Sequence, residues 1–201
     1  GRPDALAERA AELGIPLLRR RFFRKKTGES IPAALDEYRV LEADLNLLAS
    51  VQVFLPREIT DSPRLKSLCF HPSLLPRFRG GAALQWQIIL GEPESGVSIF
   101  TPDDGVDTGP VVLQKSGVML SKTETTATLF FEKLQPLGIA ALVEAVELVA
   151  SGRARPWQQD ESLATAQGLV DDVVAPIDRA WPAHEIDCLV RGCDPQPGAF
   201  V

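Results

Sequence analysis

The chain has few of the residues that build disulfide or metal frameworks. Its 201 residues include three cysteines, Cys69, Cys188 and Cys193, and two histidines. The cysteines form no Cys-x-x-Cys pair, and no histidine stands at zinc-ligand spacing from them. The sequence therefore indicates neither a disulfide framework nor a metal site. Free thiols suit a reducing compartment, so we expect a cytoplasmic protein.

Long apolar runs and a surplus of positive charge are also missing. The most apolar stretch, residues 139–150, is interrupted by Glu144 and Glu147 and is too short for a membrane span, which needs about 20 apolar residues. We therefore expect no membrane partner. A formal net charge of -6 argues weakly against a constitutive nucleic-acid binder, because phosphate contacts need a surplus of lysine and arginine.

One segment departs from this acidic background. Residues 19–26 read Arg-Arg-Arg-Phe-Phe-Arg-Lys-Lys, and we call this segment the basic run. It could bind RNA, an acidic carrier protein or polyglutamate, although a solvated loop is the more ordinary interpretation.

Apolar residues recur in patterns that alternate between helix and strand. With 45% hydrophobic residues, the chain can form one well-buried domain and a fragment of a second. The alternation predicts an α/β fold with a mostly parallel sheet covered by helices. The expected helices are residues 3–13, 31–43, 82–90, 123–150 with a break near Pro136, and 182–191; the expected strands are residues 15–18, 45–48, 67–70, 97–100 and 111–114.

The texture changes after Gly152, where a proline-rich and polar run begins. This change indicates that residues 1–155 form one domain, and that residues 156–201 are a peripheral tail or the approach to another domain. The chain opens on a helix, whereas a doubly wound domain normally opens on a core strand. This order predicts that a strand-helix-strand unit precedes residue 1.

Two segments carry residues suited to chemistry. Residues 71–80 read His-Pro-Ser-Leu-Leu-Pro-Arg-Phe-Arg-Gly and follow an expected strand, whose carboxyl end is where ligands bind in open α/β sheets. Residues 103–109 read Asp-Asp-Gly-Val-Asp-Thr-Gly, a loop with three carboxylates. Taken alone, they indicate a histidine and an aspartate acting as an acid/base pair on neighbouring loops.

These two segments resemble the hallmark loops of the folate-dependent formyltransferase family. A His-x-Ser-Leu-Leu-Pro segment and an Asp-Thr-Gly segment at this spacing are specific to that family. The likeness extends over the whole chain, and it looks nearest to the N-terminal hydrolase domain of 10-formyltetrahydrofolate dehydrogenases. It implies the formyltransferase fold, in which a Rossmann-like, folate-binding and catalytic domain over residues 1–155 is followed by a linker and the beginning of a smaller C-terminal domain over residues 156–201. It also implies 10-formyltetrahydrofolate as formyl donor, with tetrahydrofolate as product and no metal.

The resemblance also implies roles for particular residues. His71 would be the catalytic acid/base and Asp107 the orienting carboxylate, with Cys69 beside them at the catalytic centre. The segments that would line the folate pocket contribute Leu48, Ser50, Gln52, Val53, Phe54, Leu55, Ser73, Leu74, Leu75, Arg79, Asp103, Asp104, Gly105 and Val106.

Cys69 stands where most transferases of the family carry an asparagine that helps to hold the oxyanion. A thiol is a poor hydrogen-bond donor, so we expect hydrolysis of 10-formyltetrahydrofolate with water as acceptor. A dehydrogenase module or a carrier protein in the full-length chain is the expected partner. Three alternatives stay open: transfer to methionyl-tRNA or another amine such as an amino sugar or a carrier-bound amino acid; a folate-binding domain without catalysis; and an RNA-binding protein.

Overall fold

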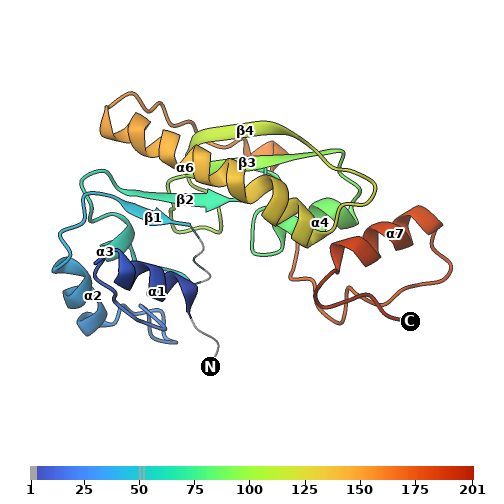
Figure 1. Ribbon diagram of the computed structural model, residues 1–201, viewed down its shortest axis with the longest axis horizontal. Coiled ribbons are helices and arrows are strands. Elements are labelled where there is room, and N and C mark those ends of the chain that lie inside the picture. The colour runs from blue at the N-terminus through green and yellow to red at the C-terminus, as the bar shows by residue number, and fades with distance from the viewer. Residues whose placement is uncertain (1–3, 50, 52) are drawn as a thin grey trace.

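A computed structural model describes residues 4–49, 51 and 53–201 of the chain. At its centre lies a four-stranded sheet with strand order β1-β2-β3-β4 (Figure 1). The strands are β1 (Asn46–Leu48), β2 (Ser67–His71), β3 (Glu94–Phe100) and β4 (Val111–Met119). Helices α1 (Ala5–Glu12), α2 (Pro32–Arg39) and α3 (Arg57–Thr60) lie at one end of the sheet, and α4 (Ala83–Ile89) and α7 (Ala183–Gly192) lie at the other. The α/β class expected from the sequence is confirmed.

The orientation of the strands differs from the mostly parallel sheet that the alternation predicted. Strands β1 and β2 are parallel, whereas β2 with β3 and β3 with β4 are antiparallel. A loop without a helix joins β3 to β4, too short for a parallel crossover. Helix α4 packs on α7 and on the short helix α5 (Thr126–Thr128) and stays at the end of the sheet where β2 finishes. Strand β3 therefore starts at that same end and runs antiparallel to β2.

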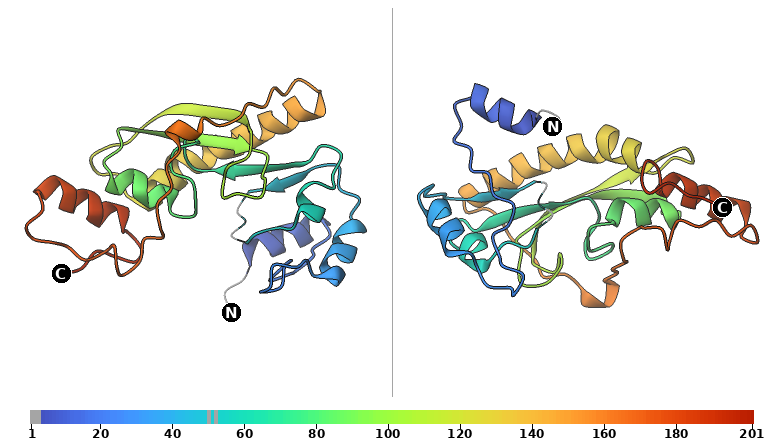
Figure 2. Two further views of the ribbon diagram at one scale, coloured as in Figure 1. Left: turned by 180° about the vertical axis from the view of Figure 1, so that it is seen from behind. Right: turned by 90° about the horizontal axis from the view of Figure 1, so that it is seen from below.

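One face of the sheet is covered by α6 (Gln135–Ala150). Small residues let this helix approach closely: Gly138, Ala141 and Ala145 are buried, and a Cβ added at Gly138 would lie 2.3 Å from the Phe70 ring. The periodicity of the sequence predicts a buried stripe of Ile139, Leu142, Val143 and Val146 on this helix, yet Ile139 and Val143 are more than half exposed. Figure 2 (right) shows α6 on one side of the sheet and the short 3-10 helix η2 (Glu161–Leu163) on the other.

Three further sequence expectations need correction. Residues 15–18 form no strand. Pro136 does not break the long helix, because it stands in the first turn of α6, where a proline lacks no needed donor; the π-helical turn η1 (Leu129–Leu134) precedes it. Strand β4 continues to Met119 instead of ending at residue 114.

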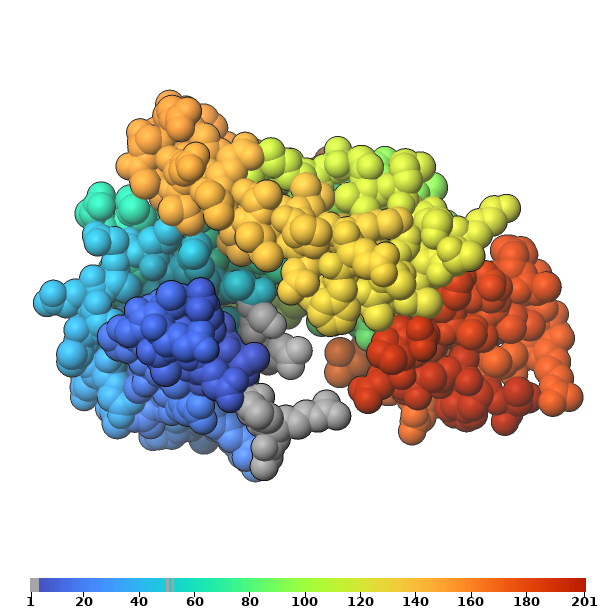
Figure 3. Space-filling view, in the orientation of Figure 1, coloured from blue at the N-terminus to red at the C-terminus, as the bar shows by residue number. Residues whose placement is uncertain are grey.

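The two terminal parts of the chain are separated on the surface of the molecule. Figure 3 shows the N-terminal helices and the C-terminal segment at opposite ends of the molecule, with α6 between them. No helix in the described part of the chain is long and apolar enough to cross a membrane.

Candidate active site

Strand β2 delivers Cys69 and His71 to the face of the sheet opposite α6. Successive strand residues point to alternate faces: Leu68 and Phe70 pack toward α6, and Cys69 joins Leu75, Phe100 and Val111 in a small apolar cluster. His71 is the last residue of β2 and is only 5% exposed.

The two ring nitrogens of His71 face different groups. Nε2 lies 2.7 Å from the carbonyl oxygen of Phe78, and because a carbonyl can only accept, Nε2 carries a proton and donates it. Nδ1 lies 3.4 Å from the Oδ2 atom of Asp107. In a neutral ring Nδ1 is therefore the free base, and a proton taken up there would be stabilised by the Asp107 carboxylate.

Asp107 is held in place by its own backbone and by the histidine loop. Its φ of 55° lies in the left-handed region, which aspartate tolerates better than most residues. Its Oδ2 atom accepts a hydrogen bond of 2.7 Å from the Gly80 backbone amide, and Gly80 itself has a φ of 97°. The carboxylate thus joins the Asp-Thr-Gly loop to the end of the histidine loop.

A row of polar side chains across the sheet supports the histidine loop. Ser98, on β3, pairs with His71 on β2 and with Gln114 on β4. The Ser98 hydroxyl donates to the Ser73 carbonyl (2.7 Å) and accepts from the Leu75 amide (3.0 Å), while Gln114 Nε2 donates to the Leu75 carbonyl (3.0 Å). The loop that carries the site is therefore bonded to two strands that contribute no catalytic group.

A clamp formed by Arg79, Gln159 and Glu161 ties both loops together. Gln159 Nε2 donates to the carbonyl oxygens of Asp107 (2.8 Å) and Gly109 (2.7 Å), and its Oε1 accepts from Arg79 Nη2 (2.8 Å). Arg79, 8% exposed, also forms a two-pronged ion pair with Glu161. We call these three residues the Gln159 clamp.

Sequence reasoning missed the supporting residues Ser98, Gln114, Gln159, Glu161 and Thr165. Thr165 Oγ1 accepts from the Phe78 amide at 2.8 Å, which holds the residue whose carbonyl faces His71. Polar residues within an apolar strand, such as Ser98 in β3, were the available signal. No such signal marks the Gln159 clamp, because Gln159 and Glu161 lie 80 and 82 residues after Arg79 in the chain.

The residues expected to line a folate pocket fall into two groups. Ser73, Leu75 and Arg79 are buried, and the contacts above engage them within the protein. Leu48, Leu55 and Leu74 are half-buried, and Val53, Phe54, Asp103, Asp104, Gly105 and Val106 are exposed. Leu48 pairs with Cys69, so the segment after β1 starts beside the site. Ser50 and Gln52 lie outside the described residues.

The acidic loop over residues 103–109 is braced locally. Asp103 Oδ1 accepts from the Gly105 amide (3.0 Å) and from Thr108 Oγ1 (2.5 Å), and Asp104 lies 3.2 Å from Arg57 Nε. These contacts leave Asp107 as the carboxylate of the loop that faces His71.

Cys69 does not have the surroundings of a nucleophile. Burial, and secondarily the negative charge of Asp107, raise the pKa of its thiol to about 12. A thiol with that pKa holds almost no thiolate near neutrality, and the thiolate is the reactive form. Cys69 therefore acts as a small apolar residue beside the histidine.

The stability of the fold should fall on mild acidification because of His71. Burial lowers the pKa of His71 below its ordinary 6.5, against the opposing influences of Asp107 and the Phe78 carbonyl. The unfolded chain then binds a proton that the folded chain does not, so stability is lost as the pH falls from about 6.5 toward the lowered pKa. We expect the free energy of unfolding, measured with denaturant, to fall more between pH 7.5 and pH 5.5 for the native protein than for His71→Gln. Equal falls in the two proteins would contradict this account.

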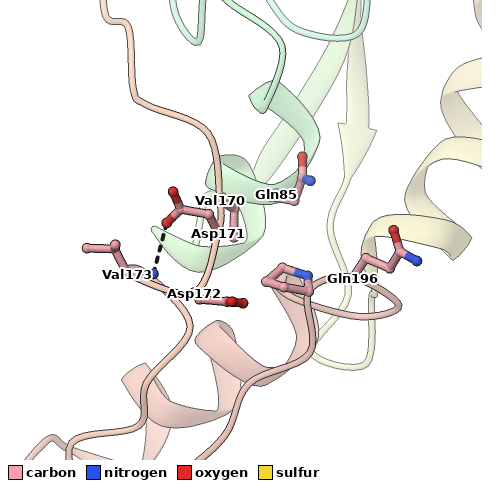
Figure 4. Close-up of a pocket in the computed structure, with 7 residues that line it drawn as sticks. Gln85, Val170, Asp171, Asp172, Val173 and Gln196 are labelled. Carbon is pink, nitrogen blue, oxygen red and sulfur yellow. Dashed lines mark hydrogen bonds between the residues drawn. The ribbon is translucent and has the colours of Figure 1, made fainter.

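A separate hollow of about 590 Å³ lies between α4 and the C-terminal segment. Figure 4 shows Asp171 and Asp172 beside Gln85 and Gln196 at its edge. None of the residues that line it belongs to the two loops or to the Gln159 clamp. Within the described residues, no group of three or more histidine, cysteine, aspartate or glutamate side chains could hold a metal ion.

Comparison with known proteins places this geometry in context. The family model described as "Formyl transferase" matches residues 3–146. The chain is 40% identical over 201 residues to the cytosolic 10-formyltetrahydrofolate dehydrogenase of Homo sapiens, covering all of this chain and 22% of that protein. It is 36% identical over 195 residues to the methionyl-tRNA formyltransferase of Stutzerimonas stutzeri, covering 97% of this chain and 60% of that one.

Solved structures show the same fold. The structure of HypX from Aquifex aeolicus in complex with tetrahydrofolic acid matches with a TM-score of 0.72 and 23% identity, over 84% of this chain and 29% of that chain. The chain thus spans less than a third of that protein and about a fifth of the human dehydrogenase.

Proposed function

The chain belongs to the formyl transferase family, and from this premise we propose that it releases the formyl group of 10-formyltetrahydrofolate to water, giving formate and tetrahydrofolate. The observation that carries the proposal is the pairing of buried His71 with Asp107, at 3.4 Å, on the two loops that resemble the family's hallmark segments. We further propose that the domain works beside a dehydrogenase module, as the names of its relatives suggest. A cytoplasmic location stays a prediction.

The geometry supports an acid/base role for His71. Attack of water on the formyl carbon requires loss of a proton from the water and gain of a proton by N10 of the departing folate. The free Nδ1 of His71 can accept the first proton and return it to N10, so that the two transfers balance. Asp107 would stabilise the imidazolium between the two steps, and the Phe78 carbonyl would keep the proton on Nε2 throughout.

Two observations favour water over an amine as acceptor. Cys69 occupies the position where most transferases of the family have an amide donor, and its thiol donates only weakly. The 40% identity to the human dehydrogenase extends over the whole chain. Transfer to methionyl-tRNA is the second candidate, since the transferase of Stutzerimonas stutzeri is nearly as similar, at 36% identity.

The deciding experiment is an assay of formate and tetrahydrofolate produced from 10-formyltetrahydrofolate by the full-length protein without an amine. Formate release by the native protein that is absent in the His71→Asn variant would support hydrolysis. Turnover that starts only when methionyl-tRNA or an amino sugar is added would replace hydrolysis with transfer. Binding of tetrahydrofolate without any turnover would favour a catalytically inactive folate-binding domain.

Replacing Cys69 with alanine should leave most of the activity intact. Because the thiol stays protonated and packs in an apolar cluster, alanine removes one sulfur atom and no reactive group. We expect kcat within about fivefold of the native value, since a small cavity costs stability more than chemistry. A loss of more than 100-fold, or a formyl thioester trapped on Cys69 and seen by mass spectrometry, would restore this residue to the catalytic centre.

A further inference from the structure

The segment that follows α6 is bonded to both loops of the candidate site. Trp157 forms a two-bond backbone bridge with Val111, the first residue of β4, with N···O distances of 2.9 and 3.0 Å. Further along, the Thr165 carbonyl accepts from the Arg79 amide (2.9 Å), and the Thr165 amide donates to the Pro76 carbonyl (3.2 Å). Figure 2 (right) shows this segment, which includes η2, on the face of the sheet opposite α6. Backbone contacts thus place Thr165 against the histidine loop.

Phe78 has a backbone conformation that its surroundings must impose. Its φ of 59° lies in the left-handed region, which is unfavourable for a bulky residue and persists only where contacts enforce it. The Phe78 side chain is 4% exposed, and the Phe78 amide donates to Thr165 Oγ1 at 2.8 Å. With its ring buried and its amide held, Phe78 presents its carbonyl to His71 Nε2 at 2.7 Å. Thr165 therefore reaches the histidine through a single residue.

The Phe78 carbonyl decides which nitrogen of His71 is the base. Because a carbonyl only accepts, it holds the proton on Nε2 and leaves Nδ1 free, 3.4 Å from Asp107 Oδ2. If that carbonyl turned away, a neutral ring would be more stable with its proton on Nδ1, where the Asp107 carboxylate accepts it. Nδ1 would then no longer be free to take a proton. The direction of one carbonyl group therefore sets the nitrogen that can act in proton transfer.

We propose that Thr165 is a positioning residue for catalysis: its hydroxyl holds the Phe78 peptide and thereby keeps the His71 proton on Nε2, so that Nδ1 is the base. The inference rests on the proposed function, in which Nδ1 takes a proton from the attacking water. An oxygen is required at this position, because a methyl group cannot accept from the Phe78 amide.

The test compares Thr165→Val with Thr165→Ser in the full-length protein. Valine keeps nearly the same shape and removes the acceptor, whereas serine keeps the acceptor. For formate release from 10-formyltetrahydrofolate, we expect kcat of the valine variant to fall about 10-fold to 100-fold, because a displacement near 1 Å in a site has costs of that order. KM should change by less than about threefold, since a proton transfer is impaired and not binding. Serine should restore most of kcat.

The pH dependence of kcat separates positioning from a general loss of structure. Burial lowers the pKa of His71, whereas Asp107 and the Phe78 carbonyl raise it, the latter because its hydrogen bond supports the protonated ring. Weakening that bond in the valine variant should lower the pKa further, so the acid limb of the profile should move to lower pH. The other ionisable neighbours are unchanged: the protonated Cys69 thiol, and Arg79, whose charge acts on Asp107. A loosened fold would instead lose activity at higher pH.

Thr126→Val is the matched control. The Thr126 hydroxyl donates to the Gly192 carbonyl at 2.9 Å, so the variant also loses a hydroxyl hydrogen bond, but one that joins α5 to α7 outside both loops. We expect thermal unfolding to show a loss of stability in both valine variants, and only Thr165→Val to show the fall in kcat and the moved acid limb.

A Thr165→Val protein with native kcat and a native pH profile would overturn the inference, and so would a serine variant as slow as the valine variant or an acid limb moved to higher pH. These results would leave the proposed function intact, because formate release by the native protein is measured in the same experiment. If the native protein transfers the formyl group only to an amine, the proposed function fails, and the same comparison made with that amine still decides the inference. A native protein without turnover on water or amine would overturn both.

Discussion

Replacing Asp107 with asparagine is expected to lower the rate of formate release roughly 10,000-fold, the order seen when the aspartate behind a catalytic histidine loses its charge. Asparagine tolerates the left-handed φ of 55° as well as aspartate does, and its carbonyl oxygen can still accept from the Gly80 amide. The variant therefore removes the charge and keeps the fold. If the side chain instead flips so that its amide nitrogen takes the place of Oδ2, that nitrogen would donate to His71 Nδ1 and block the free base, and the bond from the Gly80 amide would be lost.

The measurement is single-turnover release of formate, together with the dissociation constant for tetrahydrofolate. We expect the rate to collapse while affinity changes by less than about fivefold, because Asp107 acts on the charge that forms during reaction. A loss of affinity as large as the loss of rate would mean that Asp107 binds the folate instead of assisting His71. A rate within tenfold of native would remove Asp107 from the mechanism.

Replacing Gly109 with alanine should damage both stability and activity. A Cβ at this position would lie 1.8 Å from the backbone carbonyl oxygen of Thr101, and a backbone atom cannot turn aside as a flexible side chain can. Overpacking of this kind costs up to about 3 kcal/mol, which corresponds to a fall in melting temperature of roughly 6 to 12 °C for a chain of this size. The shifted loop would also move Asp107, and a displacement near 1 Å can cost about 100-fold in rate.

Gly168→Ala supplies the matched control, because a Cβ there meets nothing within 4 Å. Thermal unfolding and formate release would be measured for both variants. A Gly109→Ala protein that melts within 2 °C of the native one, a threshold set by the smallest shift expected for about 1 kcal/mol, would show that the loop gives way easily and that Gly109 is not required for its shape.

The sequence predicted the strand and the two loops of the candidate site, but it did not predict the residues that hold them in place. Strand β2 and the two loops were located because apolar periodicity marks a strand and because the loops carry unusual residue combinations. The mixed sheet was missed, since strand direction depends on where α4 packs, and that depends on contacts with α7 almost 100 residues away. Likewise the side chains of Ile139 and Val143 fit a buried stripe by periodicity, yet the close approach of Gly138 to Phe70 turned them outward.

The Gln159 clamp shows a different limit of prediction from sequence. Gln159 reads as one residue of a polar loop, and only the folded chain brings its amide to the carbonyl groups of Asp107 and Gly109. A local sequence pattern cannot predict a contact between residues 50 or more positions apart in the chain. No periodicity identifies a single side chain that makes such a contact.

Gln159 also determines how short a fragment of this chain can be and still keep the site braced. The matched family stretch ends at residue 146, and a boundary drawn near residue 155, where the composition changes, would likewise cut the clamp from the loop that it braces. A fragment trimmed at either point would keep His71 and Asp107 yet leave the Asp107 and Gly109 carbonyls and the Arg79 guanidinium without their partners. Anyone who grafts this module onto another protein should therefore carry the chain at least through Thr165, which holds Phe78 in place.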